Sequence, residues 1–334
     1  MNILIIGGTG LIGSEAAIEL MRKGNSVTGV ALPDKLKAPE GMKVIYGNYL
    51  EMTDEELGKL LKGQDVLIFA AGVDERLEGP PPIYEMYNKY NIEPLKKILP
   101  IAKASKIKNV VICGSYFSHF DKIWPELELS KWHPYIRSRR EQERVALSFS
   151  DEDFSVVILE LPYIFGTQKG RKPVWVFLVE MLKAMKPFCF YTAGGTTMVT
   201  VRQVAQAIAG AAFYNKGGNC YPIGYYNLTW KEMLKIMYRT MGEDNKKIIT
   251  IPNWMFDLYA KKILKENKAK KIESGLDLTR FSSLQSRRQF ILKEEGCALL
   301  GVEEDDIVKA IESSVKQSME FLEKREEMVG MRGE

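Results

Sequence analysis

Short apolar runs recur along the first half of the chain, at residues 2–6, 26–30, 43–46, 66–70, 109–113 and 154–159. Each run is nearly continuous in hydrophobicity, which is typical of strands buried on both faces of a parallel sheet. The segments between them predict helices. In residues 13–23, for example, the apolar side chains share one helix face, and Gly24-Asn25 then ends the helix. Alternation of strand and helix predicts an α/β fold with a doubly wound parallel sheet.

The pattern of residues along the chain changes after Pro162. Residues 166–173 are rich in Gly, Lys and Pro and predict a loop that leaves the sheet. Helices are predicted at 174–185 and 201–213, with short strands at 188–191 and 220–223. Thr229 to Glu232 has the spacing of a capping box that opens a helix ending near Gly242, and acidic residues at 303–306 precede a last helix through about Glu327. We therefore predict a first domain in 1–165, rejoined by about 196–224, and a smaller mixed domain in 166–334.

Charge and composition exclude several classes of protein. In 334 residues there are 47 Lys and Arg against 43 Asp and Glu, and a formal net charge of +4 argues against a nucleic-acid partner. The basic run from Lys261 to Lys271 is interpreted as a solvated helix face. Four distant cysteines and two histidines exclude a zinc ribbon, a dithiol site and a His-rich metal centre. Neither a transmembrane segment nor a signal peptide is apparent, so we expect a cytoplasmic protein without a membrane partner.

A glycine-rich segment follows the first predicted strand and opens the first predicted helix. One glycine allows the tight turn, one lets a pyrophosphate approach the backbone, and one lets helix and strand pack closely. The start of the helix adds unpaired N–H groups and the positive end of its dipole. In this strand–turn–helix context the segment predicts a dinucleotide-binding site with contacts from Gly7, Thr9, Gly10, Leu11, Ile12 and Gly13.

The glycine spacing is GxxGxxG, Ala70-Ala71-Gly72 closes the fourth predicted strand, and Asn91 lies downstream. In this form the chain resembles the short-chain dehydrogenase/reductase superfamily, and its length and C-terminal half resemble the extended branch, the NAD-dependent epimerase/dehydratase family. The segment 161–166, which contains Pro162, is similar to the family's turn after the sixth strand, and 201–205 to a helix start of the family. The resemblance covers nearly the whole chain. It implies a Rossmann-type domain that binds NAD or NADP, followed by a substrate domain, with further cofactor contacts from Ala70, Ala71, Gly72, Asn91 and Pro162.

The end of the second predicted strand does not discriminate between NAD and NADP. NAD binders usually hold an acid there and NADP binders an arginine nearby, whereas the matching residue is Ala31. Lys35 lies on the following loop, where it either meets a 2′-phosphate or is solvated. Asn48 stands where the family commonly has an Asp that contacts adenine, and an amide can still donate and accept there. Lys35 and Asn48 are therefore candidate contacts, and both cofactors stay open.

The resemblance also implies a catalytic group. In the family a Tyr is the acid/base, a Lys four residues later holds the ribose and lowers the pKa of the Tyr, and a Ser orients the substrate oxygen. Ser115 and Tyr135 fit the Ser and Tyr positions, but Arg139 replaces the Lys. Tyr135 and Arg139 share one helix face. A permanent guanidinium charge can still lower the pKa of a phenol, although it cannot pass a proton.

The substrate side of the sequence is less specific. The polar anchors that many extended-family members use for nucleotide sugars are absent, because the corresponding positions are Pro162 or Tyr163, and Thr196. The basic residues of 166–173 are either cations for a substrate or simply exposed. The aromatic residues of the second domain are interpreted as its core rather than a pocket lining: Trp175, Phe177, Phe188, Phe190 and Tyr191.

Two hypotheses for function follow. The first is an NAD(P)-dependent oxidoreductase or epimerase/dehydratase that transfers hydride at a carbonyl or alcohol carbon of a small molecule beside Tyr135. The second is a dinucleotide-binding protein without turnover that works as a sensor or partner-binding module. A homodimer is one expectation for its assembly.

Overall fold

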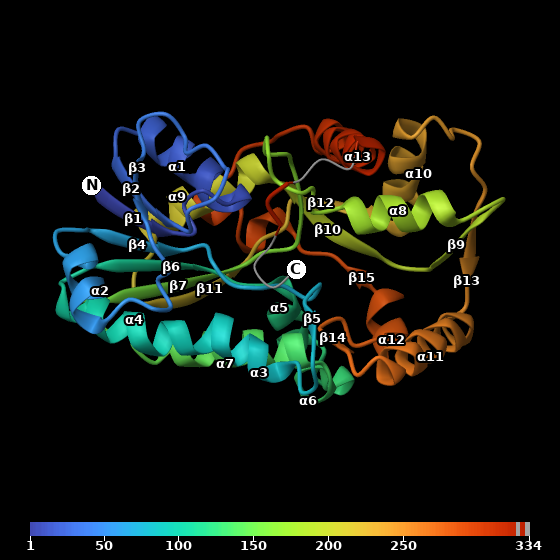
Figure 1. Cartoon of the computed structure of the whole chain (residues 1–334), viewed down its shortest axis with the longest axis horizontal. Coiled ribbons are helices and arrows are strands. Elements are labelled where there is room, and N and C mark those ends of the chain that lie inside the picture. Colours follow the sequence, from blue (N-terminus) through green and yellow to red (C-terminus); the bar gives the residue numbers. More distant parts are fainter. Residues whose placement is uncertain (325–327, 331–334) are drawn as a thin grey trace.

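The computed structural model describes residues 1–324 and 328–330. Its centre is a seven-stranded sheet, in the order β3-β2-β1-β4-β6-β7-β11, in which all neighbouring strands are parallel (Figure 1). The strands are β1 (Asn2–Ile6), β2 (Ser26–Ala31), β3 (Lys43–Tyr46), β4 (Val66–Phe69), β6 (Asn109–Cys113), β7 (Ser155–Glu160) and β11 (Gly218–Pro222). This is the doubly wound Rossmann-type sheet predicted from the sequence. The strand order reverses between β1 and β4, which is where such sheets bind ligands, outside the carboxyl ends of their strands.

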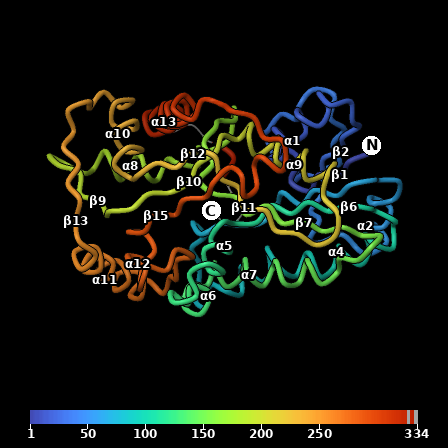
Figure 2. The backbone as a smooth tube through the Cα atoms, turned by 180° about the vertical axis from the view of Figure 1, so that it is seen from behind, coloured from blue at the N-terminus to red at the C-terminus, as the bar shows by residue number. Residues whose placement is uncertain are grey.

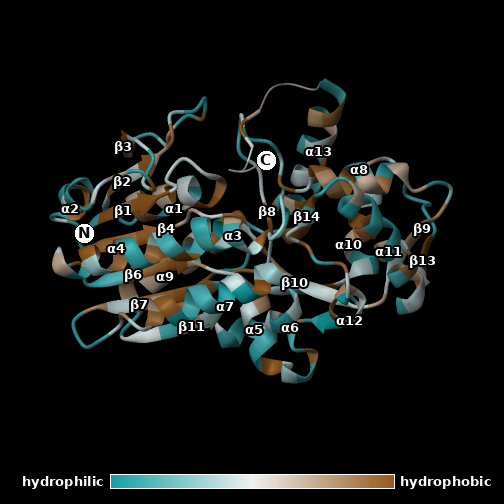
Figure 3. Ribbon diagram, turned by 60° about the horizontal axis from the view of Figure 1, so that its bottom comes forward, coloured by the Kyte–Doolittle hydropathy of each residue, from teal (hydrophilic) through white to brown (hydrophobic). Residues whose placement is uncertain are grey.

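Helices cover both faces of this sheet (Figure 1). Ile3 and Ile5 of β1 pack against the helices of one face, whereas Leu4 and Ile6 pack against those of the other. Burial on both faces explains why β1 is apolar at successive positions. In Figure 3, β1 is brown and α7 is largely teal. The first face carries α1 (Leu11–Arg22) and α9 (Val201–Tyr214); the second carries α2 (Asp54–Leu61), α4 (Glu93–Ala104) and α7 (Pro134–Leu147).

The second lobe is built on a smaller sheet, β12-β10-β15, to which β8 adds by pairing with β10. An apolar core that includes Trp175 and Trp230 joins this sheet to three helices. A β9–β13 ribbon leads into α11 and α12 (Figures 1 and 2). The elements are β8 (Tyr163–Phe165), α8 (Val176–Ala184), β9 (Cys189–Thr192), β10 (Gly195–Thr200), β12 (Tyr226–Thr229), α10 (Trp230–Thr240), β13 (Ile248–Ile251), α11 (Asn253–Ala269), α12 (Phe281–Gln285), β15 (Arg288–Gln289) and α13 (Ile307–Lys324).

Short elements lie at the junction of the two lobes. The strands β5 and β14 pair antiparallel and connect the segment after β4 with the segment after α11. A π-helical turn, Asn88–Ile92, separates α3 from α4. The remaining short elements are β5 (Glu78–Gly79), α3 (Tyr84–Tyr87), α5 (Tyr116–Ile123), α6 (Leu129–Trp132) and β14 (Glu273–Ser274), with 3₁₀ turns at Pro125–Leu127, Lys293–Glu295 and Ala298–Leu300.

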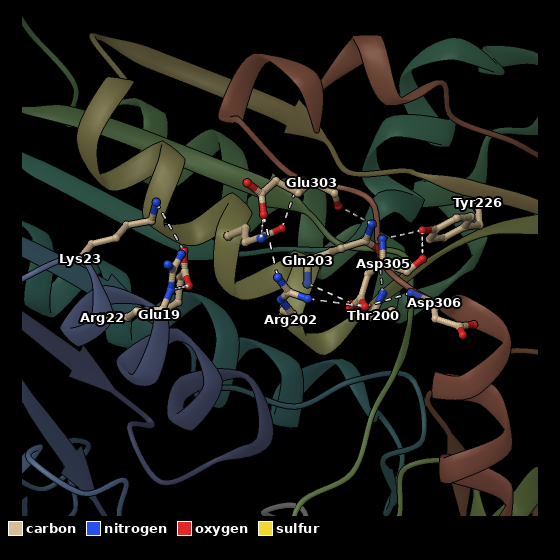
Figure 4. Close-up of polar contacts among 11 residues, drawn as sticks. Glu19, Arg22, Lys23, Thr200, Arg202, Gln203, Tyr226, Glu303, Asp305 and Asp306 are labelled. Atoms are coloured by element: carbon tan, nitrogen blue, oxygen red, sulfur yellow. Dashed lines mark hydrogen bonds and ion pairs between the residues drawn. The ribbon is translucent and has the colours of Figure 1, made fainter.

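After β10 of the smaller sheet, the chain returns to the central sheet through α9 and β11 before β12 and β15 complete the smaller sheet. Polar contacts tie the start of α9 to the segment 303–306 (Figure 4). The Thr200 hydroxyl donates to the Asp305 carboxylate at 2.7 Å, and Gln203 Nε2 donates to the Glu303 carbonyl at 3.0 Å. The Asp305 N–H donates to the Tyr226 phenol oxygen at 2.8 Å. These bonds hold the approach to α13 against both lobes.

The predicted elements recur with ends shifted by a few residues, and the capping box at Thr229 is present. The predicted end of the last helix near Glu327 lies outside the described residues. The prediction that the second domain's aromatic residues form its core was wrong in part. Trp175 is buried, but Phe188 and Phe190 are exposed because Cys189 takes the inner face of β9. Phe177 is also exposed. Among the described residues, no helix is both long enough and apolar enough to cross a membrane.

Candidate functional site

The glycine-rich turn joins β1 to α1 at the point where the strand order reverses. Gly7 has a φ of +88°, in the left-handed region that favours glycine. The N–H groups of Gly7 and Gly8 donate to the Val30 carbonyl at 2.9 and 3.2 Å, which ties the turn to β2. A Cβ at Gly7 would lie 2.7 Å from the Ala70 oxygen, and one at Gly13 only 2.2 Å from the Gly7 oxygen. These glycines are required by the packing of the turn itself.

Gly10 has a different environment. Its φ of −71° suits any residue, and a Cβ there would approach only the Gly7 oxygen, at 3.2 Å, and Arg171 Nη1, at 3.9 Å. Gly10 is the N-cap of α1 and supplies no side-chain cap, so the first-turn N–H groups of Leu11 and Ile12 have no partner within the helix. Space, free N–H donors and the positive end of the helix dipole meet at Gly10. This combination fits the phosphates of a dinucleotide.

A loop from the second half of the chain crosses the glycine-rich turn. Gln168 Nε2 donates to the carbonyl of Thr9 at 2.8 Å and to the hydroxyl of Ser14 at 3.2 Å. Gln317 of α13 donates to the Gln168 carbonyl at 3.0 Å. The loop thus carries Arg171 close to Gly10, whereas from the sequence its basic residues were expected to be either cations for a substrate or simply exposed. The sequence separation of about 160 residues left no signal for this contact.

The end of the chain pairs with the same loop. The Lys172 N–H donates to the Val329 carbonyl at 2.9 Å, and the Val329 N–H donates to the Gly170 carbonyl at 3.1 Å. This two-bond bridge flanks Arg171. We term residues 168–172 the crossing loop.

The expected adenine side of the site lies beyond β2 and β3. Ala31 ends β2, and Lys35 is exposed on the following loop. Asn48 Nδ2 donates to the Glu51 carboxylate, and Asn48 Oδ1 accepts from the Leu50 N–H at 3.3 Å. The cofactor contacts of Lys35 and Asn48 stay predictions.

The residues after β4 are held by Asn91. Gly72 has a φ of +124°, and a Cβ there would lie 2.6 Å from Asn91 Oδ1. The buried Asn91 amide accepts from the Val73 N–H at 2.9 Å and donates to the Val73 carbonyl at 3.0 Å. Both ends of this side chain are therefore engaged in fixing the turn. Direct cofactor contacts from Ala70, Ala71, Gly72 and Asn91 stay predictions, as does that of Pro162, which is buried between β7 and β8.

Ser115, Tyr135 and Arg139 come together at the carboxyl edge of the sheet. Tyr135 and Arg139 lie one turn apart on α7, and Arg139 Nε donates to the Tyr135 phenol oxygen at 3.1 Å. Ser115 is the N-cap of α5, and its hydroxyl acts to lower the pKa of Tyr135. Burial raises the pKa of Tyr135 to about 12, although Arg139 acts to lower it. Without a cofactor, the phenol is neutral at neutral pH and can donate a proton.

Arg139 does more than contact Tyr135. Its Nη1 donates to Gln142 Oε1 at 2.8 Å and to the Cys113 carbonyl at 3.4 Å, and its Nη2 donates to the Val73 carbonyl at 3.1 Å. The side chain is only 6% exposed. One guanidinium therefore joins α7 to the ends of β4 and β6, which the three donors of a lysine on a flexible stem would not match in geometry.

Gln142 extends this network to the π-helical turn. Its Nε2 donates to the Asn91 carbonyl at 2.7 Å, so Gln142 links Arg139 to the segment that holds the chain after β4. Sequence analysis missed Gln142. The available signal was its helical spacing, because it follows Arg139 by three residues on the same face of α7.

Glu75 is a second residue that sequence analysis missed. It is half-buried after β4, and its charge acts on Tyr135, Arg139 and Tyr116. Burial raises the pKa of Glu75 to about 7, and the neighbouring Asp74 acts in the same direction. Glu75 can therefore gain or lose a proton near neutral pH. Its position just after a central strand, at the edge where parallel strands form sites, was the usable signal.

Two further polar residues of α5, Ser118 and His119, have other surroundings. Ser118 is fully buried, and its hydroxyl has no hydrogen-bond partner among the described residues. His119 Nδ1 lies 4.0 Å from a carboxylate oxygen of Glu160, and burial lowers the pKa of the imidazole.

Comparison with known proteins identifies the family. The family described as NAD(P)H-binding matches residues 7–174, about half of the chain. The chain belongs to this family. The match begins at Gly7 of the turn and includes Ser115, Tyr135 and Arg139. Membership establishes NAD or NADP as the cofactor. No curated protein sequence matches the chain.

Solved structures share the fold over both lobes. The crystal structure of gox2253 has a TM-score of 0.74 at 18% identity and covers 97% of this chain and 99% of its own. The UDP-glucuronic acid 4-epimerase from Bacillus cereus, in complex with UDP-glucuronic acid and NAD, has a TM-score of 0.67 at 13% identity, covering 96% and 100%. MoeE5 in complex with UDP-glucose and NAD has a TM-score of 0.64 at 15% identity, with the same coverage. At these identities the similarity establishes the fold.

Proposed function

We propose that the chain is an NAD(P)-dependent oxidoreductase or epimerase/dehydratase of the extended short-chain type, with Tyr135 as its acid/base. The observation that carries this proposal is the hydrogen bond from Arg139 Nε to the buried Tyr135 phenol, beside Ser115. A phenol needs a nearby cation to ionise near neutral pH, and Arg139 supplies a permanent one. The shared fold with NAD-bound epimerases adds support.

The bound nicotinamide supplies or accepts the hydride. Ser115 orients the substrate oxygen, and Tyr135 donates a proton to that oxygen or removes one from it. Arg139 stabilises the phenolate that remains after donation. Because the guanidinium keeps its proton, Arg139 cannot return one to Tyr135. Glu75, which titrates near neutral pH, is our candidate for the residue that exchanges this proton with solvent.

The surroundings of Thr196 decide which compounds should be tested first as substrates. It is fully buried in β10, and its hydroxyl lies 3.0 Å from the Tyr116 phenol oxygen. This position, where nucleotide-sugar enzymes of the family place an arginine, therefore offers no charge to a diphosphate. Small carbonyl compounds and alcohols come first in our substrate panel. UDP-sugars, which B. cereus epimerase and MoeE5 hold in their structures, come second.

Tyr135→Phe tests the proposal. The phenyl ring keeps the packing against Tyr87, whose ring centroid lies 5.4 Å away. We expect turnover on a panel substrate to fall by at least about a hundredfold, because loss of a general acid/base costs roughly 10² to 10⁴. Affinity for NAD(P), measured by calorimetry, stays within about twofold of the parent. Arg139→Met raises the pKa of Tyr135 and moves the pH–rate profile upward.

Tyr87→Phe is the matched control, because the Tyr87 hydroxyl donates to the Asp74 carbonyl at 3.1 Å rather than to Arg139. It should retain turnover. Full activity in Tyr135→Phe would show that another residue is the acid/base. A parent chain that binds NAD(P) but turns over nothing in the panel would favour the second hypothesis, a dinucleotide-dependent sensor or partner-binding module.

A further inference from the structure

The outward face of α11 exposes large apolar side chains. Trp254, Leu258 and Tyr259 are 62%, 59% and 55% exposed, and Met255 is 38% exposed. The opposite face is packed, since Ala260 is only 2% exposed. Isolated exposed apolar residues are common on protein surfaces, but four within six residues of one helix form a patch.

Lysines follow this apolar patch. Four lie on α11 itself and two directly after its end: Lys261, Lys262, Lys265 and Lys268, then Lys270 and Lys271. Helical spacing aligns Trp254 and Leu258 with Lys262 and Lys265 on one exposed face. The nearest acid on this stretch, Glu266, lies 4.0 Å from Lys262 and offsets one charge. We term this surface the α11 face; it is apolar at its start and strongly positive at its end.

The apolar start and the positive end of the α11 face together restrict the kind of partner that can bind there. A second copy of the chain, placed antiparallel on the α11 face, would cover the apolar side chains at the start of the helix but would leave the lysines that follow outside the contact. A partner that contacts the whole face must offer anions to the lysines and also accept Trp, Leu and Tyr side chains. A bilayer with anionic headgroups offers both, because aromatic rings settle at the headgroup level and lysines contact the phosphates.

We propose that the α11 face docks on an anionic lipid surface. Trp254, Leu258 and Tyr259 enter the headgroup region, and the lysines that follow contact lipid phosphates. The helix lies on the surface and does not cross it. This revises the sequence-based expectation of no membrane partner and of a merely solvated basic face.

Docking would bring the candidate active site close to the lipid. Phe256, on the inner face of α11, packs against Phe281 with ring centroids 6.4 Å apart. Phe281 and Tyr135 belong to the same apolar cluster. The chain after α11 also pairs with β5 through β14, close to Glu75. Lipid binding is nevertheless independent of the proposed reaction, and its test needs no turnover.

Vesicle flotation of the full chain tests the proposal. We expect binding to vesicles of equal parts phosphatidylcholine and phosphatidylglycerol at low salt, with little binding to phosphatidylcholine alone. Raised salt should weaken binding because it screens exposed charges. Lys262→Gln with Lys265→Gln should reduce partitioning by roughly 25-fold, at about fivefold for each lysine. Trp254→Ser with Leu258→Ser should also lower binding.

Matched controls lie on other helices. Lys231 and Lys235 are exposed on α10, and Tyr214 on α9 is 68% exposed. Lys231→Gln with Lys235→Gln, and Tyr214→Ser, should bind mixed vesicles as the parent does. Failure of the parent to bind mixed vesicles overturns the proposal, and so does parental binding by both α11 variants. Sedimentation that shows self-association of the parent, abolished by Trp254→Ser with Leu258→Ser, would instead assign the α11 face to a protein contact.

Discussion

Individual residues in the glycine-rich turn have separable roles. At Gly13 a Cβ would lie 2.2 Å from the Gly7 oxygen, whereas at Gly10 the same oxygen is 3.2 Å away and the next neighbour is the Arg171 guanidinium, at 3.9 Å. A glycine that serves folding can thus be distinguished from one that serves binding. The distinction depends on the direction of the missing Cβ, which the motif alone does not give.

Gly10→Val should therefore lower NAD(P) affinity by at least about tenfold, or roughly 1.4 kcal/mol. The loss of stability should be smaller than at Gly13, because the φ of Gly10, −71°, suits valine and its Cβ would lie 3.2 Å from the Gly7 oxygen rather than 2.2 Å. Gly13→Ala should instead destabilise the fold by about 1–3 kcal/mol, since its Cβ would lie 2.2 Å from the Gly7 oxygen. Calorimetry and denaturant unfolding measure the two effects. Parental affinity in Gly10→Val would refute the placement of the pyrophosphate.

At the scale of elements, α7 organises much of the candidate site. It carries Tyr135, Arg139 and Gln142, and it begins at His133, its N-cap. The His133 ring is fully buried beside Phe117 and Phe281, and neither ring nitrogen has a hydrogen-bond partner among the described residues. Burial lowers the pKa of His133 from 6.5 to about 4. The start of α7 is therefore sensitive to acid.

The sign of this effect follows from proton binding. Between pH 6.5 and about 4, His133 is protonated in the unfolded chain but neutral in the native chain, so native stability falls as the pH falls. The loss reaches up to about 3 kcal/mol, at about 1.4 kcal/mol per pKa unit. His133→Phe should remove this contribution, so that in urea unfolding between about pH 4.5 and pH 7.5 the variant loses less stability on acidification than the parent. Glu75 makes the free energy of unfolding change with pH in the opposite direction. This contribution is the same in the parent and in His133→Phe, so it cancels when the two are compared. Equal slopes would contradict a buried, neutral His133.

At the scale of the whole molecule, segments far apart in sequence meet at the glycine-rich turn. The crossing loop is held between Thr9 and Gln317 of α13, and Val329 bridges it on either side of Arg171. The position of the Arg171 guanidinium beside Gly10 thus depends on the last part of the chain. We therefore expect folding of the second lobe to be coupled to cofactor binding.

Val329→Pro tests that coupling, because proline lacks the N–H that donates to the Gly170 carbonyl at 3.1 Å. One lost hydrogen bond of about 1 kcal/mol should weaken NAD(P) binding by roughly fivefold if it displaces Arg171. Arg171→Met should weaken binding at least as much, and Val329→Ala should behave as the parent. In the double variant Arg171→Met, Val329→Pro, the loss of NAD(P) affinity should be smaller than the sum of the losses in the two single variants. Full additivity in calorimetry would show that Val329 acts independently of Arg171.

Much of the first half could be predicted from the sequence because its signals are local. Strand periodicity, the glycine spacing and the capping box at Thr229 each depend on residues close in the chain. The contact between Tyr135 and Arg139 was also predictable, since a four-residue spacing puts both on one helix face.

Contacts between distant segments were decided by the tertiary structure alone. The Val73 and Cys113 carbonyls reach Arg139 because β4 and β6 are neighbours in the sheet and end at the same edge. Arg171 reaches Gly10 because the second lobe folds back over the turn. Phe190 is exposed because the packed face of β9 is taken by Cys189, and Phe188 next to it is exposed as well. Local dihedral preferences and periodicity determine elements, whereas the packing of those elements determines which side chains meet.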